Sequence, residues 1–506
     1  MGRTTLPSAT PTPAEPARDD ATFDVISPAT GAVVGSYPIR TPAEVAATVA
    51  DARRAADWWS RIGFAERARR LDAWRGEITR GRAELAQLIH QEMGKPLADA
   101  RLEIAMALEH LAWAAGNARR VLGPRAVRPG LLAVNQECTL EYRPFGVVGV
   151  IGPWNYPVFT PLGSVSFALA AGNAVVFKPS EYTPGVGHWL AGRFAAVVPE
   201  QPVFQVITGL GDTGAALCRS GVGKIGFTGS TATGKRVMAA CAETLTPVLM
   251  ELGGKDALIV DADADLDAAA DAAVWGGMSN AGQTCLGVER VYVHTDVYDE
   301  FVPKLLAHAR KLRAGTGAAK IGPITMGKQI AIIRHHIEDA LARGARALLG
   351  GADAIDGQFV QPTILVDVPE DAVAVTEETF GPTLTVARVR DMDEAIERVN
   401  AGPYGLGSTV FSRRNGRRIA DRIRAGGTSI NAYVAHATIA RLPLGGVGDS
   451  GFGRVHGEDG LKEFTYAKAT TRQRFALPLA LTTFTRGETT DAIVDRLVTA
   501  LHGRNR

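Results

Sequence analysis

The sequence predicts an α/β fold built around a parallel, doubly wound sheet. From Val147 onward, short apolar runs alternate with segments of helical periodicity, which is the pattern of strand–helix–strand units. Runs such as Val147–Ile151 and Ala174–Phe177 are apolar throughout, as expected for strands buried on both faces. A chain of 506 residues is also too long for one hydrophobic core, so two or three domains are expected.

The expected elements can be placed in order along the chain. Residues 43–122 are predicted to be helical because their apolar positions recur at helical spacing. The partial alternation of residues 134–142 predicts an antiparallel ribbon. The first α/β set has strands at 147–151, 174–177, 203–208, 224–227 and 247–252, and helices at 161–171, 185–198, 213–219 and 231–242. The second set has strands at 258–260, 288–293, 383–389 and 408–411, and helices at 264–279, 297–312, 392–400 and 417–425.

The two ends of the chain differ from its centre. Residues 1–20 are rich in Pro, Thr, Ala and Asp and lack the apolar stretch of a signal peptide, so we expect a disordered lead-in. Residues 467–475 predict an edge strand. The mildly apolar residues 492–501, within a C-terminal extension at 481–506, favour a docked helix over a membrane anchor.

Composition narrows the class of protein. The formal net charge is +2, which gives no electrostatic argument for nucleic acid or an anionic membrane. The four cysteines form no C-x-x-C pair, so a reducing compartment is the simplest interpretation. No run of about 18 apolar residues predicts a transmembrane helix. A cytoplasmic protein is expected, and no metal site is predicted.

Two glycine-rich segments follow predicted strands. Residues 209–214, which include Gly211, match G-x-G-x-x-G, either as a turn near a dinucleotide or as a purely structural turn. Residues 226–234 join a strand to a helix and contain Thr228, Gly229, Ser230 and Gly234. Free N–H groups at that helix start favour a phosphate, although ordinary capping by Ser230 would explain the same residues.

Three further motifs carry chemical groups. Glu251 and Leu252 precede two glycines at a predicted strand end. The glycines should leave little side-chain cover around the carboxylate, and strand ends of an α/β sheet face the ligand crevice, although an ordinary surface glutamate would explain the same residues. Cys285 stands among small residues after a helix, as a nucleophile or as an inert buried thiol. Trp154 and Asn155 lie between two prolines, where the amide could donate to an oxyanion or simply form a turn.

Taken together, these motifs resemble the aldehyde dehydrogenase superfamily of the hydrolytic, NAD(P)-dependent type. The resemblance covers about residues 24–475. Seven matches occur in family order: PWNYP at 153–157, KPSE at 178–181, FTGSTATG at 227–234, ELGGK at 251–255, GQTC at 282–285, EETFGP at 377–382 and GGVGDSGFGR at 445–454.

The resemblance implies a role for each matching residue. Cys285 resembles the nucleophile that forms a thioester, Asn155 with the Cys285 N–H resembles the oxyanion hole, and Glu251 resembles the general base. The implied cofactor is NAD, with NADP possible. The implied cofactor contacts are Trp154, Lys178, Ser180, Glu181, Gly211, Thr228, Gly229, Ser230, Gly234, Leu252, Glu378 and Phe380.

The resemblance also implies a domain organisation. A variant Rossmann cofactor domain is expected from residues 21–126 and 147–253, and an α/β catalytic domain from 254–449. A β-ribbon oligomerisation domain is expected from 127–146 and 466–480, giving a homodimer or homotetramer. The expected partner is a small-molecule aldehyde, without nucleic acid or membrane.

The substrate stays open at this point. Gly448 replaces a lysine common in the family and resembles a subset acting on apolar or aromatic aldehydes, whereas His456–Leu461 resembles a type labelled succinate-semialdehyde dehydrogenase. The residues expected to line the aldehyde tunnel are mostly apolar or small, namely Tyr156, Phe159, Thr160, Gly163, Leu286, Val434, His436 and Ile439. An apolar or aromatic aldehyde is favoured over succinate semialdehyde, whose carboxylate would need Arg441 or protonated His436.

Two other function classes remain as alternatives. A CoA-acylating dehydrogenase would release the acyl group to CoA, but such enzymes lack the general-base glutamate that Glu251 matches. A non-catalytic structural protein on the same fold would be marked by loss of the nucleophile, whereas Cys285, Glu251 and Asn155 are all present.

Overall fold

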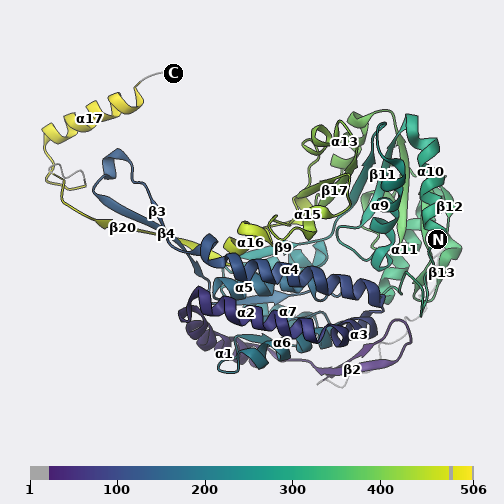
Figure 1. Ribbon diagram of the computed structural model, residues 1–506, viewed down its shortest axis with the longest axis horizontal. Coiled ribbons are helices and arrows are strands. Elements are labelled where there is room, and N and C mark those ends of the chain that lie inside the picture. Colours follow the sequence, from purple (N-terminus) through teal and green to yellow (C-terminus); the bar gives the residue numbers. More distant parts are fainter. Residues whose placement is uncertain (1–21, 478–481, 504–506) are drawn as a thin grey trace, which may run out of the picture. The chain divides into compact units, whose positions relative to one another are not determined.

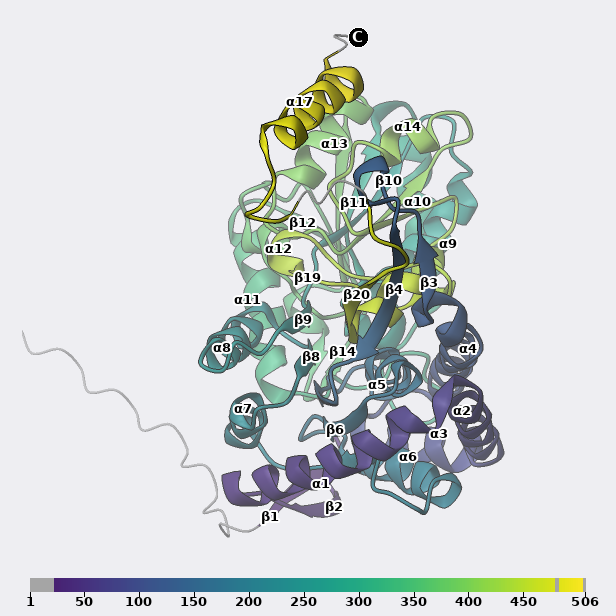
Figure 2. The ribbon, with the colours of Figure 1, turned by 90° about the vertical axis from the view of Figure 1, so that its left-hand side faces the viewer.

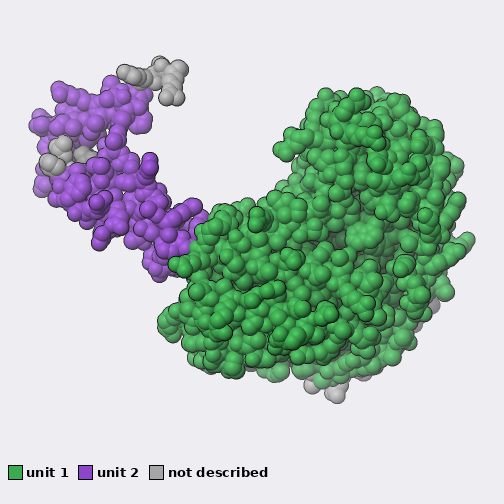
Figure 3. All heavy atoms as spheres, in the orientation of Figure 1, with its two compact units in different colours: residues 1–121, 144–465 green, residues 122–143, 466–506 purple. Residues whose placement is uncertain are grey.

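The computed structural model describes residues 22–477 and 482–503. The lead-in expected at 1–20 lies outside these residues. Two compact units are present, coloured green and purple in Figure 3. Unit 1 comprises Met1–Val121 and Pro144–Thr465, and unit 2 comprises Leu122–Arg143 and Tyr466–Arg506. Across the described residues, no helix has the length and apolarity needed to span a membrane.

The first sheet of unit 1 confirms the predicted strand–helix alternation. Its strands are β5 (Val147–Ile151), β6 (Ala174–Lys178), β7 (Phe204–Val206), β8 (Lys224–Thr228), β9 (Val248–Glu251) and β19 (Gly451–Phe452). They lie in the order β19-β9-β8-β5-β6-β7. The five strands β5 to β9 are parallel, and β19 adds an antiparallel edge against β9. All residues of β5 and β6 are buried, as their unbroken apolar runs predict.

Helices surround this sheet (Figures 1 and 2). They are α1 (Pro42–Arg61), α2 (Gly63–Arg80), α3 (Arg82–Met93), α4 (Leu97–Leu122), α5 (Phe159–Ala171), α6 (Pro184–Val197), α7 (Gly211–Arg219) and α8 (Thr231–Ala242). Helix α1 begins with a capping box between Thr41 and Glu44, and the Ser230 hydroxyl caps α8; both satisfy amides that the helix leaves free. Helix α5 begins at Phe159 without a cap from its own N-cap residue.

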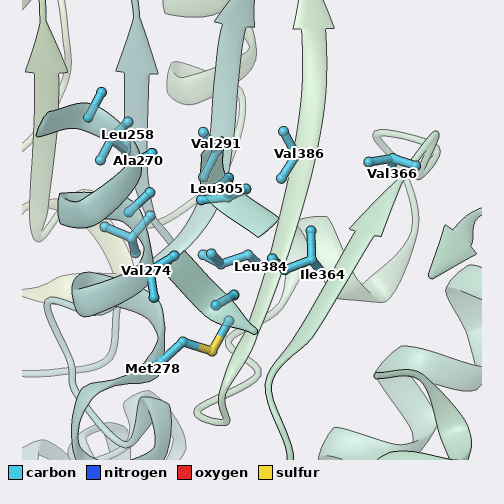
Figure 4. Packing of buried hydrophobic residues seen from close by; sticks show 14 of the residues in the cluster. Leu258, Ala270, Val274, Met278, Val291, Leu305, Ile364, Val366, Leu384 and Val386 are labelled. Atoms are coloured by element: carbon cyan, nitrogen blue, oxygen red, sulfur yellow. The ribbon is translucent and has the colours of Figure 1, made fainter. Parts of the chain in front are cut away.

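A second sheet forms the other half of unit 1. Its strands are β10 (Asp256–Val260), β11 (Val288–His294), β12 (Arg346–Leu349), β15 (Thr363–Val366), β16 (Thr383–Val389), β17 (Gly407–Phe411) and β18 (Gly427–Ile430). The order is β12-β15-β16-β11-β10-β17-β18, parallel except for β12. Apolar side chains such as Val291, Leu384 and Val386 pack with Val274 and Leu305 of two covering helices (Figure 4).

The helices of this half are α9 (Leu266–Met278), α10 (Thr295–Ala309), α11 (Gly327–Ala342), α12 (Val373–Thr376), α13 (Met392–Asn400), α14 (Gly416–Ala420) and α15 (Ala435–Thr438). Helix α16 (Gly457–Glu463) packs on α5 of the first half instead. Helix α14 is shorter than the segment expected at 417–425. Two short ribbons, β1 (Thr22–Ile26) with β2 (Val33–Pro38) and β13 (Ile355–Asp356) with β14 (Phe359–Val360), were not predicted.

Unit 2 contains an antiparallel sheet in the order β20-β4-β3. Its strands are β3 (Arg125–Val127), β4 (Gln136–Pro144) and β20 (Thr465–Gln473), which confirms the antiparallel ribbon and the late edge strand. Helix α17 (Glu488–His502) confirms a helix within the C-terminal extension. The expectation that it docks was wrong for the described residues, because none of the helix's residues is buried and only Ile493 and Val494 of its apolar residues are half-buried.

Candidate functional site

Two cavities in unit 1 meet at the ends of β5, β8 and β9. The first, of about 230 Å³, is lined by Trp154, Asn155, Ser230, Glu378 and Phe380 among others. The second, of about 420 Å³, is lined mostly by apolar residues. Thr228, Glu251 and Cys285 line both cavities. A thiol and a carboxyl group are therefore accessible from two sides, so that two different molecules could meet over them.

The loop that carries Cys285 is locally strained. Asn280 and Ala281 adopt left-handed backbone angles, with φ of 51° and 58°, which non-glycine residues rarely adopt unless their surroundings enforce them. The loop is held by Gln283, whose side chain donates to the carbonyls of Asn280 and Pro323 and accepts from the Thr325 N–H. The half-buried Cys285 side chain is thereby fixed beside both cavities.

Glu251 lies at the end of β9 and is only 4% exposed. The sequence predicts an open carboxylate, and this expectation was wrong because Gly253 and Gly254, which follow Leu252, let other groups approach closely. A Cβ atom at Gly253 would lie 2.5 Å from Glu378 Oε2, and one at Gly254 would lie 2.6 Å from the Cys285 carbonyl oxygen. The two glycines therefore allow the Glu378 side chain and the Cys285 loop to pack against this strand end.

Burial controls the electrostatics of the site. It raises the pKa of Glu251 to about 7, an effect partly offset by the nearby Cys285 thiol and Thr228 hydroxyl. No hydrogen bond of normal geometry reaches the Glu251 oxygens from the described residues, and burial remains the largest effect on this pKa. Burial, followed by the charge of Glu251, raises the pKa of the Cys285 thiol. Burial also raises the pKa of Glu378 to about 8.

The amide of Asn155 points toward the Cys285 loop. Its Nδ2 donates to the Gln283 carbonyl at 3.0 Å, two residues before the cysteine. Its backbone carbonyl accepts from Asn280 Nδ2 at 3.0 Å and from Lys95 Nζ at 2.7 Å. The next residue, Tyr156, has its hydroxyl 3.0 Å from Thr284 Oγ1. The turn with the amide and the loop with the thiol are thus joined by direct hydrogen bonds.

A family model described as the aldehyde dehydrogenase family matches residues 16–470. The chain belongs to the aldehyde dehydrogenase family. It is accordingly an aldehyde dehydrogenase that uses NAD or NADP, as its motifs predict.

Curated and solved relatives agree with this assignment. A 4,4'-diapolycopene aldehyde oxidase of Methylomonas sp is 38% identical, over 90% of this chain and 87% of that protein. A succinate-semialdehyde dehydrogenase [NADP(+)] of Escherichia coli K12 is 36% identical, over 89% of this chain and 94% of that protein. PnpE, a protein from Pseudomonas sp. WBC-3 solved in complex with nicotinamide adenine dinucleotide, has a TM-score of 0.87 and 34% identity, with 92% of this chain and 96% of that chain covered.

The structure brings together ten of the site residues that were predicted from the sequence. These line the 230 Å³ cavity and are Trp154, Asn155, Thr228, Gly229, Ser230, Glu251, Leu252, Cys285, Glu378 and Phe380. The Trp154 and Phe380 rings pack edge to face at 5.7 Å. The other five lie outside the lining of this cavity: Lys178, Ser180, Glu181, Gly211 and Gly234.

These five residues lie nearby in the first sheet and its helices. Lys178 ends β6, and Ser180 Oγ lies 3.3 Å from a Glu181 carboxylate oxygen in the following turn. Gly211 begins α7 and faces open space. Gly234 lies in α8, where a Cβ atom would meet Leu252 at 2.6 Å, so this glycine permits close packing of the helix on the strand end.

The lining of the 420 Å³ cavity corrects part of the tunnel lining that was predicted from the sequence. Tyr156, Phe159, Thr160, Leu286 and Val434 line it as expected, but Gly163, His436 and Ile439 do not. The space beside Gly163 is filled by His456, whose Nε2 would lie 2.8 Å from a Cβ atom there.

Several lining residues of this aldehyde dehydrogenase were missed from the sequence. Met326, Gln329 and Ile332, at and within the start of α11, line the 230 Å³ cavity, and Leu102, Met106 and Trp275 line the 420 Å³ cavity. They belong to ordinary helical segments, so no local motif marks them; only the apolar periodicity of those helices was available. Among the described residues, no three His, Cys, Asp or Glu side chains are grouped to hold a metal ion.

Proposed function

We propose that Cys285 is the nucleophile of this aldehyde dehydrogenase, that Asn155 and the Cys285 N–H form its oxyanion hole, and that Glu251 is its general base. The observation that carries the proposal is that Glu251 and Cys285 line both cavities. An aldehyde carbon and a hydride acceptor can therefore meet at the sulfur from opposite sides. The motif resemblance supports the same roles.

The reaction then proceeds through a covalent intermediate. The thiolate of Cys285 attacks the aldehyde carbon, and the carbonyl electron pair moves to oxygen to form a tetrahedral alkoxide, which Asn155 stabilises by donating a hydrogen bond. A hydride then leaves the carbon for the acceptor that bound NAD(P)⁺ would supply, and the carbonyl reforms as a thioester. Water attacks the thioester while Glu251 takes its proton. The carbon–sulfur bond breaks with both electrons on sulfur, so the carboxylic acid leaves and the Cys285 thiolate is restored.

The 230 Å³ cavity, which we call the cofactor-side cavity, has residues that suit a dinucleotide. Ser230 is the N-cap of α8, whose first free amides suit a phosphate, and Glu378 and Phe380 line the same cavity. Bound NAD(P)⁺ would supply the hydride acceptor, and its positive ring charge would favour an ionised thiol beside it. Trp154, Ser230, Glu378 and Phe380 are the residues we infer to hold it, with Lys178, Ser180 and Glu181 toward the adenosine ribose and Gly211 and Gly234 in the supporting turn and helix.

We further propose an apolar or aromatic aldehyde as the substrate. The aldehyde would bind in the 420 Å³ cavity, which we call the aldehyde-side cavity. None of the residues that line it is Lys or Arg. His456, which does line it, has its pKa well below 6.5 because it is buried, so it adds no positive charge. A carboxylate-bearing aldehyde would bury an unpaired charge near Glu251 and Asp271, which is unfavourable. The name of the Methylomonas relative, a diapolycopene aldehyde oxidase, supports the apolar assignment.

A direct competition tests this substrate class. Hexanal or benzaldehyde should exceed succinate semialdehyde in kcat/KM by about tenfold or more, which corresponds to about 1.4 kcal/mol of transition-state preference. Arg441 is exposed and does not line the cavity, so Arg441→Ala should leave the ratio unchanged. A semialdehyde that wins by the same factor, together with loss of that margin in Arg441→Ala, would identify Arg441 as a carboxylate anchor and refute the apolar assignment.

NAD should be preferred over NADP. Glu181 would place its carboxylate against the 2′-phosphate of NADP, and like charges repel in a partly buried site. Lys178 is buried beside it and opposes this effect. The measurement is kcat/KM for each cofactor. Glu181→Gln should shift the ratio of the two values toward NADP. Glu243→Gln, a change at the protein surface, should leave this ratio unchanged. A higher value for NADP in the unaltered enzyme would refute the preference.

We also propose the domain organisation that the resemblance implies. Residues 21–126 and 147–253 would bind the cofactor, 254–449 would complete the catalytic half, and 127–146 with 466–480 would join subunits into a homodimer or homotetramer in the cytoplasm. The free thiols of Cys138, Cys218, Cys241 and Cys285 support a reducing compartment. Analytical ultracentrifugation that gives only a monomer would refute the oligomer.

A further inference from the structure

Two buried lysine–glutamate pairs lie next to the site, one on each side. We infer that they are positioning pairs: Lys95 and Glu103 fix the turn with Asn155, and Lys255 and Glu289 fix the turn with Glu378 and Phe380. Each pair would then affect a different part of the reaction. The first pair would affect the chemistry at the aldehyde carbonyl, and the second would affect binding of the cofactor. This inference rests on the roles proposed above.

The first pair connects helix α4 to the oxyanion turn. The Lys95 ammonium group and the Glu103 carboxylate form an ion pair in which neither side chain is exposed. Lys95 Nζ also donates to the Asn155 carbonyl at 2.7 Å and lies 3.8 Å from the centre of the Tyr156 ring. Glu103 Oε1 accepts from the backbone N–H groups of Val158 at 2.8 Å and Phe159 at 3.1 Å.

Glu103 therefore supplies the cap that α5 lacks in its own sequence. The N-cap residue of α5 is Val158, which has no side-chain hydrogen-bond acceptor. Without Glu103, two amides at the buried helix start would lack a protein acceptor. Asn155 is thus held through its own carbonyl by Lys95 and through the following helix start by Glu103. A small shift of either group would move the Asn155 amide relative to Cys285.

The second pair repeats this arrangement on the cofactor side. Lys255 and Glu289 form an ion pair with exposed side-chain fractions of 2% and 4%. The Glu289 carboxylate accepts from the N–H groups of Thr379 at 2.8 Å and Phe380 at 2.9 Å. Lys255 Nζ donates to Thr379 Oγ1 at 3.1 Å. The turn so held contains Phe380, whose φ is 51°, and follows Glu378 directly.

Stability alone is a weak explanation for such pairs. Removing two charges from water costs much of what their attraction returns, and well-packed apolar residues often serve as well. Here each carboxylate accepts two consecutive backbone N–H groups, and each ammonium group donates to the same turn. The shared geometry at two separate turns, both next to residues that line the cavities, indicates that the charges fix the position of these turns.

The test compares equivalent variants of three buried pairs. Glu103→Gln and Glu289→Gln keep one acceptor oxygen for the backbone amides but do not neutralise the lysine. Lys95→Met with Glu103→Gln, and Lys255→Met with Glu289→Gln, are neutral versions that avoid a lone buried charge. The Lys224–Glu463 pair, with 6% and 22% exposed side chains, does not line either cavity, so Glu463→Gln is the matched control.

The expected result is a split between two measurements. Variants of the first pair should lower kcat/KM for hexanal or benzaldehyde by about tenfold to a hundredfold, as small misplacements of reacting groups do, with the NAD dissociation constant unchanged. Variants of the second pair should weaken NAD binding by about tenfold, measured by fluorescence titration without aldehyde. Glu463→Gln should alter thermal stability alone. Parallel losses in both measurements for both pairs, or variants of a pair that do not fold, would assign that pair a structural role only.

A double-mutant cycle separates this inference from the proposed function. If Glu103 acts through Asn155, then Glu103→Gln should have little further effect on kcat/KM once Asn155 is alanine, because contacting residues in one network are not additive. Full multiplication of the two losses would overturn the positioning role. Unchanged activity in Asn155→Ala alone would instead refute Asn155 as the oxyanion donor, whatever Glu103 does.

Discussion

Cys285→Ala should lower aldehyde oxidation by at least about a thousandfold, as removal of a covalent nucleophile does, while NAD still binds. The Cys285 side chain lines both cavities together with Glu251 and Thr228, and of these three residues only Cys285 carries a thiol. Alanine keeps the backbone N–H and fills less space, so the Cys285 loop, held by Gln283, should keep its shape. The measurements are initial rates of NADH formation and the NAD dissociation constant of the same protein sample.

The other cysteines provide the control. Cys138 lies in unit 2 on β4 and lines neither cavity, so Cys138→Ala should retain full activity. Cys218 and Cys241 are buried in α7 and α8, and their replacement would report on packing. Turnover in Cys285→Ala above about one part in a thousand would require another nucleophile and would refute the thioester mechanism.

The sequence predicted the fold well where one local pattern determined the structure. Three elements have the predicted bounds, namely the strand at 147–151 and the helices at 231–242 and 392–400. An unbroken apolar run defines the strand, and a cap with helical periodicity defines each helix. The C-terminal helix was predicted correctly, but the prediction that it docks was wrong. A mildly apolar segment does not show which surface, if any, covers it.

Site residues that belong to sequence motifs were predicted, whereas residues that reach the site only through contacts between distant segments were missed. Asn155 and Cys285 lie in two separate loops and Glu251 ends strand β9, and the sheets bring these three residues together. Lys95 and Glu103 were missed because their contacts with residues 155–159 span about 55 to 60 positions of the sequence, and a lysine with a glutamate eight residues later is an ordinary surface pattern. The filling of the space at Gly163 by His456 likewise depends on tertiary packing.

Glu251→Gln should slow hydrolysis of the thioester more than its formation. The amide keeps the shape of the side chain but takes no proton, and loss of a general base costs about 10²–10⁴-fold. Steady-state turnover should fall by that factor, while a burst of NADH appears or grows because thioester accumulates. Stopped-flow absorbance measures both phases. If burst and steady state fall together, Glu251 acts before the thioester forms, and it would then be the base for the Cys285 thiol.

The pH dependence gives a second, independent check on Glu251. Burial raises its pKa to about 7, so the carboxyl group is mostly protonated below pH 7 and mostly ionised above it. Only the ionised form can take a proton from water, so the hydrolysis rate should rise as the pH increases through about 7 and then level off. Glutamine has no proton to lose at these pH values, and its residual rate should lose this inflection. An unchanged inflection in Glu251→Gln would assign the titrating group to another residue, with Glu378, whose pKa is raised to about 8, the next candidate.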